Sequence, residues 1–373
     1  MNDANNSNNS TAGVTEVAGV TVTTFKKNNA YFELSKSKVL SQFNLVNEHC
    51  DMVSYSSKTN PIVSSILEKE VSCLFSVHLV NELVNITDYT RVLFLAQAWD
   101  FEEINYLVNL GVRKFAVDNL HDLEMLENFL SKHLDLKIHL LLRLKLRENS
   151  IRTEKYFVFG MNSELINSKV KELSKLDQIE KIGIHFHRKT QNMSEWNYGF
   201  ELAELFDEEF FDCIDVVNMG GGLPAAYANT DMRLLTGIFK KIDLFRDWLT
   251  EKKIKLIIEP GRFIAAPSGK LIAKVIAVDA GTVVVNASVY NSDMDAVIVP
   301  VKLLIEGEKN KGSEGSLQYC IKGLTPCSLD LFRYRVYLNP VSVGDELVFL
   351  NSGAYNFSSN FCNLDVPETR IVE

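Results

Sequence analysis

Apolar runs and amphipathic segments alternate through the middle of the chain, from Cys50 to about Arg262. Eight short runs are apolar or β-branched: MVSYSS (52–57), CLFSV (73–77), RVLFLA (91–96), KFAVD (114–118), IHLLLRL (138–144), KIGIHFH (181–187), IDVVNM (214–219) and KLIIE (255–259). Between such runs, residues 119–133 and 232–253 carry apolar positions every three or four residues, as in a helix that buries one face. Asn119 stands where the first of these helices needs an N-cap.

Hydrophobic strands separated by helices predict a parallel sheet that is covered on both faces. Eight such units in about 210 residues fit a closed (β/α)8 barrel. An open doubly wound sheet usually has fewer strands, and no G-x-G-x-x-G fingerprint follows the first run. The barrel is therefore the favoured fold, and we expect it over residues 41–265.

The flanking segments alternate with a period of two instead. Residues 14–34 are rich in Val and Thr, and residues 268–373 contain the strand-like runs KLIAKVIAVDAGTVVVNASVY, DAVIVPVKLLIEG and GDELVFLNSGAY. This pattern predicts a C-terminal β-barrel or β-sandwich domain at 266–373, which the N-terminal strand or strands at 14–40 join. The polar start, residues 1–13, predicts a disordered tail without the features of a signal peptide.

Composition excludes several classes of function. Of 373 residues 46% are hydrophobic and 23% are charged, with a net charge of −9, which argues against a nucleic-acid or anionic-membrane surface. No apolar stretch reaches the roughly 18 residues of a membrane span. The six cysteines form no CxxC pair, so we expect reduced thiols, no metal site and a cytoplasmic location.

Residues that could take part in catalysis or binding follow four of the predicted strands. They are Lys58, the segment HFHRKTQ (185–191), the segment NMGGGLP (218–224) and the segment EPGR (259–262). In a (β/α)8 barrel the reacting groups lie at the carboxyl ends of strands, and phosphates often bind after strands seven and eight. Singly, each motif has an ordinary structural explanation, such as a solvated lysine or a tight turn. Together they predict a site for a phosphorylated cofactor that needs an amine.

These motifs resemble those of the fold-type III pyridoxal-phosphate decarboxylases, which act on ornithine, lysine, arginine and meso-diaminopimelate. The segments YSSKTNP, FAVDNLHDLEML, HFHRKTQ, MGGGLP, EPGRF and NSGAYNFSSNF are similar to YAVKANP, FAVxSxxELxxL, HFHxGSQ and the later motifs of that family. The similarity runs from about residue 30 to the C-terminus. It implies a barrel with a β domain, in agreement with the pattern above.

The resemblance implies how a cofactor, pyridoxal 5′-phosphate, would be held. Lys58 would attach it covalently, His187 would stack on its ring, and Glu259 would pair with the ring nitrogen. The phosphate would be bound by a set of residues around the last two strands: Thr190, Gly220, Gly221, Gly222, Gly261, Arg262 and Tyr355.

The resemblance also implies a substrate side. Cys327, in KGLTPCSLD, matches the family's cysteine, which reaches the active site of the partner subunit and helps to protonate the carbanion. Asp330 and Tyr355 would contact the substrate, and a homodimer with shared sites follows. The cysteine stands one place later than in the family, where Pro326 occupies its column, so a buried structural thiol is the alternative.

Departures from the family bear on the substrate. Ser328 replaces the acid that meets a distal amine, Ser76 replaces an aspartate, and Arg188 with Lys189 follows the histidine. The default function is decarboxylation of a small basic amino acid such as lysine, ornithine or diaminopimelate. The cations favour a tailoring decarboxylase of a larger, anionic amino-acid conjugate, as in antibiotic or siderophore biosynthesis, unless they face solvent. A racemase of the same fold and a cofactor-free regulatory paralogue are further alternatives.

Overall fold

The chain divides into two units. The computed structural model describes residues 12–17, 20–25, 30–146, 159–356 and 359–373, and 12–25 by backbone alone. The barrel unit contains 35–268 together with 353–355, and the β unit contains 269–352, 356–372 and the segment before residue 35. The predicted boundaries, after residues 40 and 265, lie a few residues away. The predicted tail, 1–13, is outside the described residues except for its last two positions.

The barrel unit is a closed barrel of eight parallel strands, which confirms the predicted fold. The strands follow the eight predicted runs: β4 (Met52–Ser56), β5 (Leu74–Val77), β6 (Val92–Ala96), β7 (Lys114–Val117), β8 (Ile138–Arg143), β9 (Ile179–His185), β10 (Val216–Asn218) and β11 (Lys255–Ile258). The barrel closes where β11 pairs with β4, with Ile257 opposite Met52. All eight carboxyl ends therefore meet at one end of the barrel.

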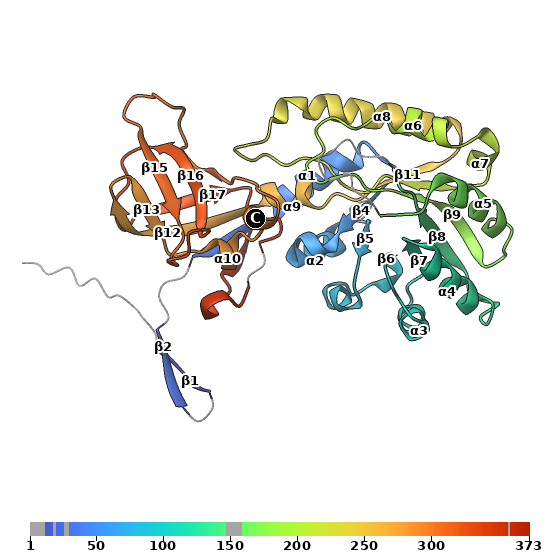
Figure 1. Ribbon diagram of the computed structural model, residues 1–373, viewed down its shortest axis with the longest axis horizontal. Helices are drawn as coiled ribbons and strands as arrows, with labels where there is room; N and C mark the ends of the chain where they lie inside the picture. Colours follow the sequence, from blue (N-terminus) through green and yellow to red (C-terminus); the bar gives the residue numbers. More distant parts are fainter. Residues whose placement is uncertain (1–11, 18–19, 26–29, 147–158, 357–358) are drawn as a thin grey trace, which may run out of the picture. The chain divides into compact units, whose positions relative to one another are not determined.

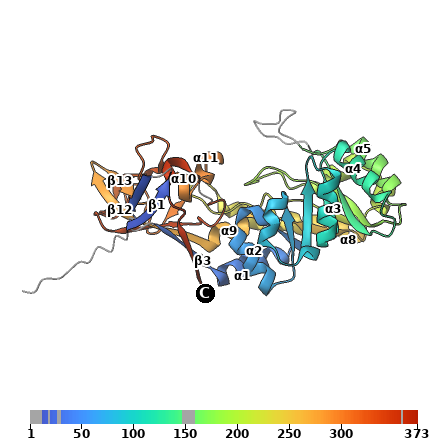
Figure 2. The same cartoon turned by 90° about the horizontal axis from the view of Figure 1, so that it is seen from below.

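Helices cover the outside of these strands in both views (Figures 1 and 2). They are α1 (Lys36–Asn47), α2 (Pro61–Glu70), α3 (Phe101–Leu110), α4 (Leu120–Leu130), α5 (Ser163–Leu173), α6 (Tyr198–Leu205), α7 (Glu208–Asp212), α8 (Leu235–Glu251) and α9 (Arg262–Ser268). The predicted cap of α4 is confirmed, because the Asn119 side chain accepts a hydrogen bond of 2.9 Å from the amide of Asp122. Among the described residues, no helix is long and apolar enough to cross a membrane.

The barrel interior is packed with apolar side chains from alternating positions of the strands. One buried cluster contains residues from six strands, all less than a tenth exposed: Leu74, Leu93, Ala116, Leu141, Val216 and Ile257. Each large aliphatic side chain buried in this way contributes about 1.5–3 kcal/mol relative to exposure. This core fixes the strands, and with them the residues at their carboxyl ends.

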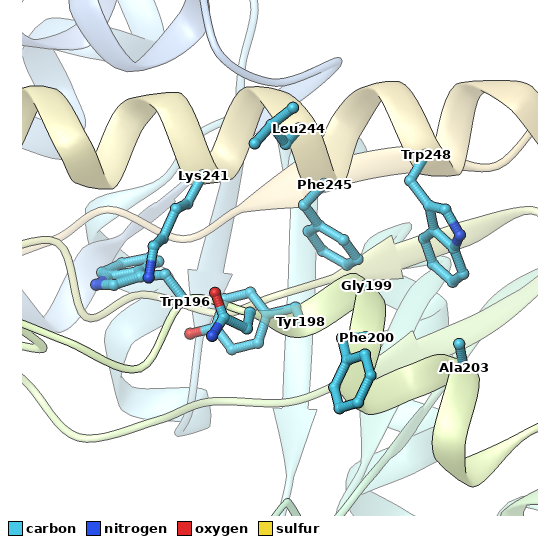
Figure 3. Close-up of a pocket in the computed structure, with 10 residues that line it drawn as sticks. Trp196, Tyr198, Gly199, Phe200, Ala203, Lys241, Leu244, Phe245 and Trp248 are labelled. Atoms are coloured by element: carbon cyan, nitrogen blue, oxygen red, sulfur yellow. The ribbon is translucent and has the colours of Figure 1, made fainter.

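A cavity of about 370 Å³ lies in the helical layer between α6 and α8. Figure 3 shows Phe245 and Trp248 pointing from α8 toward α6, with Lys241 at one side and Phe200 of α6 below Phe245. Half of its lining residues are aromatic, and its lining contains none of the residues predicted for catalysis or cofactor binding. This cavity is therefore a feature of helix packing and is separate from the strand-end site.

The β unit is a mixed sheet in which the N-terminal strand takes part, as predicted. Its strands are β3 (Tyr31–Ser35), β12 (Gly269–Asp279), β13 (Thr282–Val285), β14 (Leu304–Ile305), β15 (Leu317–Lys322), β16 (Leu331–Leu338), β17 (Glu346–Leu350) and β18 (Glu368–Val372). The order is β14-β17-β12-β13-β15-β16, with β3 paired to β12 and β18. The earlier strands β1 (Ala12–Val17) and β2 (Val20–Phe25) pair with each other.

One predicted strand is wrong. The run DAVIVPVKLLIEG forms the short helix α11 (Asp295–Ile298), and only its later part contributes the two residues of β14. A second short helix, α10 (Val289–Ser292), precedes it. Pro300 explains part of the difference, because proline cannot donate a ladder hydrogen bond and is confined to strand ends and edges.

Candidate active site

Lys58 lies at the carboxyl end of β4, in the short 3₁₀ turn η1 (Ser57–Thr59). The next residue, Asn60, ends this turn and caps α2, since its side chain accepts a hydrogen bond of 3.0 Å from Ile62. The same side chain donates to the carbonyl of Gly353 at 2.8 Å, and the amide of Tyr355 donates to the carbonyl of Thr59 at 2.9 Å. The turn that carries Lys58 is therefore held on both sides.

Lys58 as a residue is exposed, yet neighbouring protein still desolvates its side chain. This desolvation lowers the pKa of Lys58 below its ordinary value. The carboxylates of Glu82 and Glu259 raise the pKa without cancelling the effect. The two carboxylates thus act on the charge of the amine. Because the pKa of the amine is lowered, a larger fraction of it is neutral and nucleophilic than for a lysine in water.

Glu259 follows β11 and is 6% exposed. Its Oε1 accepts hydrogen bonds from the Ser76 hydroxyl at 2.7 Å and the Asn218 amide at 2.9 Å. Its Oε2 lies 3.1 Å from Nε2 of His185. Burial alone raises the pKa of this carboxyl, but the charge and hydrogen bond of His185, with the bonds from Ser76 and Asn218, outweigh it and hold the pKa well below its usual range. Glu259 is therefore a buried, ionised carboxylate.

His187 lies two residues beyond His185 and contacts the glycine triplet. The amide of Gly221 donates a 3.0 Å hydrogen bond to Nδ1 of His187, so this nitrogen carries no proton. Desolvation, and then the charge of Arg143, lower the pKa of His187, in agreement with a neutral ring. A flat, neutral imidazole in a fixed orientation is suited to stacking on an aromatic ring.

The glycine triplet is required by close packing. A Cβ on Gly220 would lie 2.5 Å from the carbonyl oxygen of Phe186, and one on Gly221 would lie 2.7 Å from that of Glu259. The amide of Gly220 donates to Asn218, as that of Gly221 does to His187. Both amides thus have partners within the chain, and their predicted contact with a phosphate stays a prediction.

Arg262 is 4% exposed and gathers hydroxyl-bearing side chains around it. Its Nη1 donates to the Tyr227 hydroxyl at 3.0 Å and its Nε to Thr190 at 3.4 Å. Its guanidinium lies 4.9 Å from the ring centre of Tyr355. The preceding Gly261 packs closely against the turn that carries Lys58, because a Cβ there would be 2.2 Å from Oγ1 of Thr59. A buried cation beside hydroxyl groups is an arrangement that fits an anion such as phosphate.

The structure of Arg188 differs from both predictions made for it, a cation that binds an anionic substrate and a residue that faces solvent. Arg188 is 3% exposed and forms ion pairs with Glu195, at 3.1 Å, and with Glu201. Lys189 lies 3.4 Å from the same Glu195. Arg188 is neither a surface residue nor a free cation for a substrate, because acidic side chains of the following loop and helix neutralise it.

The predicted substrate residues Cys327 and Asp330 belong to the β unit. The Cys327 thiol lies 3.0 Å from the hydroxyl of Tyr290, and this hydrogen bond lowers the pKa of Cys327. Asp330 is 1% exposed, and its carboxylate accepts hydrogen bonds from Thr325 and from the amide of Val289. These bonds shape the loop that carries Cys327. Contact of either residue with a substrate stays a prediction.

Three residues of the site had no predicted role: His185 and Asn218, which begin two of the motifs, and Ser76, which was noted only as a departure from the family. His185 has a signal, because residues two apart in a strand point to the same side, so it accompanies His187. Ser76 and Asn218 stand in apolar runs, where a single small polar residue gives no indication of its partner. The pairing of β10 with β11 brings Asn218 to Glu259, and the closure of the barrel between β11 and β4 brings Ser76.

The sequence of the barrel unit matches a known protein family. The family described as "Pyridoxal-dependent decarboxylase, pyridoxal binding domain" matches residues 51–266, more than half of the chain. The chain belongs to the pyridoxal-dependent decarboxylase family. The matched region coincides closely with the barrel unit and includes Lys58, His187, Glu259 and Arg262.

Relatives within this family are distant. The diaminopimelate decarboxylase of Aquifex aeolicus is 26% identical over 293 residues, covering 72% of this chain and 66% of that protein. The 2-[(L-alanin-3-ylcarbamoyl)methyl]-2-hydroxybutanedioate decarboxylase of Staphylococcus aureus is 23% identical over 287 residues, covering 69% and 70%. The chain thus spans about two thirds of the length of these relatives. The diaminopimelate decarboxylase structure from Helicobacter pylori, complexed with L-lysine, has the same fold, with a TM-score of 0.78, 19% identity and coverage of 93% and 92%.

The residues present fit the cofactor that the family implies. Glu259, a buried carboxylate, suits a cationic ring nitrogen, and Arg262 with Thr190 suits a phosphate. Lys58 supplies an amine with a lowered pKa, which suits an aldehyde. Pyridoxal 5′-phosphate, when bound there, would supply a heterocycle that accepts electrons from a carbanion.

Replacing Arg262 with lysine should weaken binding of pyridoxal phosphate by about 10- to 100-fold, since hydrogen bonds to a charged group contribute about 1.5–3 kcal/mol. Lysine keeps the charge but loses the planar fork that reaches Thr190 and Tyr227. Fluorescence titration of cofactor-stripped protein measures the change. The control is Arg233→Lys on the surface, where the arginine pairs with its neighbour Asp231. Equal affinities in the two variants would exclude Arg262 from the phosphate site.

Proposed function

We propose that this chain is a pyridoxal-phosphate-dependent decarboxylase that removes the α-carboxylate of an amino acid as carbon dioxide. The observation that carries the proposal is the buried Glu259 carboxylate, which Ser76, Asn218 and His185 hold at the same end of the barrel as Lys58. Burying a carboxylate is costly unless it is hydrogen-bonded and paired. A carboxylate kept charged at the strand ends, where Lys58 also lies, is more typical of a functional site than of a stabilising one.

Each residue has a task that its environment supports. Lys58 holds the cofactor and afterwards accepts or returns a proton through Nζ. Glu259 keeps a proton on the ring nitrogen, His187 fixes the ring plane, and Arg262 anchors the opposite, phosphate end. These four residues would hold the cofactor by its point of attachment, its ring nitrogen, its ring face and its phosphate, so that a substrate bond could be oriented relative to the ring.

Release of carbon dioxide from defined amino acids tests the proposal. Cofactor-loaded protein would be incubated with ¹⁴C-carboxyl-labelled lysine, ornithine, arginine and diaminopimelate, and with anionic amino-acid conjugates. Release above that of Lys58→Ala protein is expected with at least one compound. Exchange of the α-proton without carbon dioxide would instead identify a racemase. Protein that takes up no cofactor would identify a regulatory paralogue.

A conjugate substrate is the second candidate, and the loop around Cys327 favours it. The position after the cysteine is Ser328, and the one acid of the segment 325–330, Asp330, uses its carboxylate within the loop. This loop offers no acid for a distal amine. The name of the Staphylococcus aureus relative describes an amino acid joined to a hydroxybutanedioate, which is a large, anionic molecule.

We further propose that the enzyme acts as a homodimer in the cytoplasm, with Cys327 of one subunit serving the site of the other. Cys327→Ala should then lower turnover by roughly 100-fold, because a proton donor is lost, and should leave cofactor affinity unchanged. Cys320→Ala, a half-buried thiol of β15, is the control. Mixed dimers of Lys58→Ala and Cys327→Ala chains should regain activity. Heterodimers without recovery would show that sites are not shared.

A further inference from the structure

A chain of buried hydroxyl groups leads from the barrel wall to Glu259. The hydroxyls of Ser54, on β4, and Ser76, on β5, lie 2.7 Å apart, and that of Ser76 lies 2.7 Å from Oε1 of Glu259. Both serines are fully buried. The two serines are diagonal neighbours on adjacent parallel strands, because Ser54 stands opposite Leu74 and Ser76 follows two residues later on the same side of β5.

The hydrogen bonds between these hydroxyl groups have a defined direction, from Ser54 through Ser76 to Glu259. A carboxylate oxygen only accepts, so Ser76 must donate its one proton to Glu259. The oxygen of Ser76 then accepts from Ser54, whose proton has that partner at 2.7 Å. Both hydroxyls therefore point toward the carboxylate, and each polarises the next. Reversing the chain would require a proton on Glu259, which the lowered pKa of this carboxyl opposes.

The two carboxylate oxygens of Glu259 have different hydrogen-bond partners. Oε1 is held by Ser76 together with Nδ2 of Asn218, two neutral groups. Oε2 has Nε2 of His185 as its neighbour at 3.1 Å, and a second lone pair is left on that oxygen. One oxygen is thus fixed by the protein wall, while the other is the one suited to a cationic partner outside it.

We propose that Ser76, supported by Ser54, is a positioning residue that orients Glu259 toward the ring nitrogen of the bound cofactor. This inference rests on the proposed function. A neutral hydroxyl at this place stabilises the charged form of Glu259 without adding a second negative charge, which a carboxylate in the same place would do. Ser76 thereby keeps the shared proton on the ring nitrogen instead of on the glutamate.

The test uses protein loaded with pyridoxal phosphate that carries ¹⁵N in the ring, because the ¹⁵N chemical shift distinguishes a protonated ring nitrogen from a neutral one. Ser76→Ala should move the proton equilibrium from the ring toward Glu259 by about 10-fold or more, since a hydrogen bond to a charged group is lost. Turnover should fall by a similar factor with little change in KM. Ser54→Ala should give a smaller change in the same direction, and Ser76→Thr should restore the wild-type shift.

Ser64→Ala is the matched control. Ser64 is also fully buried, and its hydroxyl pairs with that of Ser57 at 3.0 Å, not with Glu259. Its removal should leave the ¹⁵N shift unchanged at a comparable cost in stability. An unchanged shift in both Ser76→Ala and Ser54→Ala would overturn the inference while the proposed function stands; if Ser76→Ala does not fold, Ser54→Ala alone decides. Wild-type protein that binds no cofactor would overturn both.

Discussion

Lys58→Ala should abolish covalent retention of pyridoxal phosphate and lower turnover by roughly 1,000-fold or more, since the nucleophile and a proton carrier are lost together. The turn that carries Lys58 should survive, because its hydrogen bonds run through the backbone of Thr59 and the side chain of Asn60. Reduction with borohydride followed by mass spectrometry measures the result. Wild-type protein should keep the added mass on the peptide that contains residue 58.

Lys189→Ala is the control for this experiment. Lys189 also follows a barrel strand, but its amine pairs with Glu195. We expect this variant to retain the cofactor and most of the activity. Cofactor mass on Lys189, or undiminished turnover in Lys58→Ala protein, would contradict the assignment of the amine.

The barrel could be predicted from the sequence because its strands are short, apolar and regularly spaced. Each of the eight runs is buried on both faces, so the pattern does not depend on which side of the sheet a residue takes. The order of strands then places Lys58, His187, Glu259 and Arg262 at one end without any knowledge of distances. The same logic fails for residues 295–298, where an apolar run before a proline forms a short helix.

The partners of the site residues could not be predicted in this way. Ser76 is 183 positions from Glu259 along the chain, and they meet because the barrel closes with β4 between β11 and β5. Arg188 was predicted either to bind an anionic substrate or to face solvent, and the structure shows neither. The acids that neutralise it come from a loop and a helix whose course the sequence pattern does not determine. The sequence thus indicates which reactive residues stand at the strand ends. The ionisation and orientation of their side chains depend on long-range packing, which the sequence pattern does not show.

Glu259→Gln should lower turnover by about 100- to 1,000-fold while the protein still binds pyridoxal phosphate through Lys58 and Arg262. The amide has the size of the acid but carries no charge, so it cannot hold a proton on the ring nitrogen, and the electron-accepting capacity of the ring falls. Steady-state kinetics together with the ¹⁵N shift of the bound ring measure the change. Turnover within a few-fold of wild type would show that ring protonation does not limit the reaction.

The same substitution should change how stability depends on pH. The pKa of Glu259 in the folded chain lies below its ordinary value of about 4.3. As the pH falls the unfolded chain therefore binds the proton first, so the contribution of the carboxylate to stability is full above about pH 5 and is lost on further acidification. Urea unfolding should show a difference between wild type and Glu259→Gln that shrinks from pH 6 to pH 3. Glu195→Gln, which removes an acid paired with Arg188, controls for the loss of a partly buried charge. A difference that stays constant over this range would mean that the pKa of Glu259 is the same in the folded and unfolded chains. A change of the opposite sign, with wild type gaining stability relative to Glu259→Gln as the pH falls, would mean that Glu259 is already protonated in the folded chain, and the ring nitrogen would then have no anionic partner.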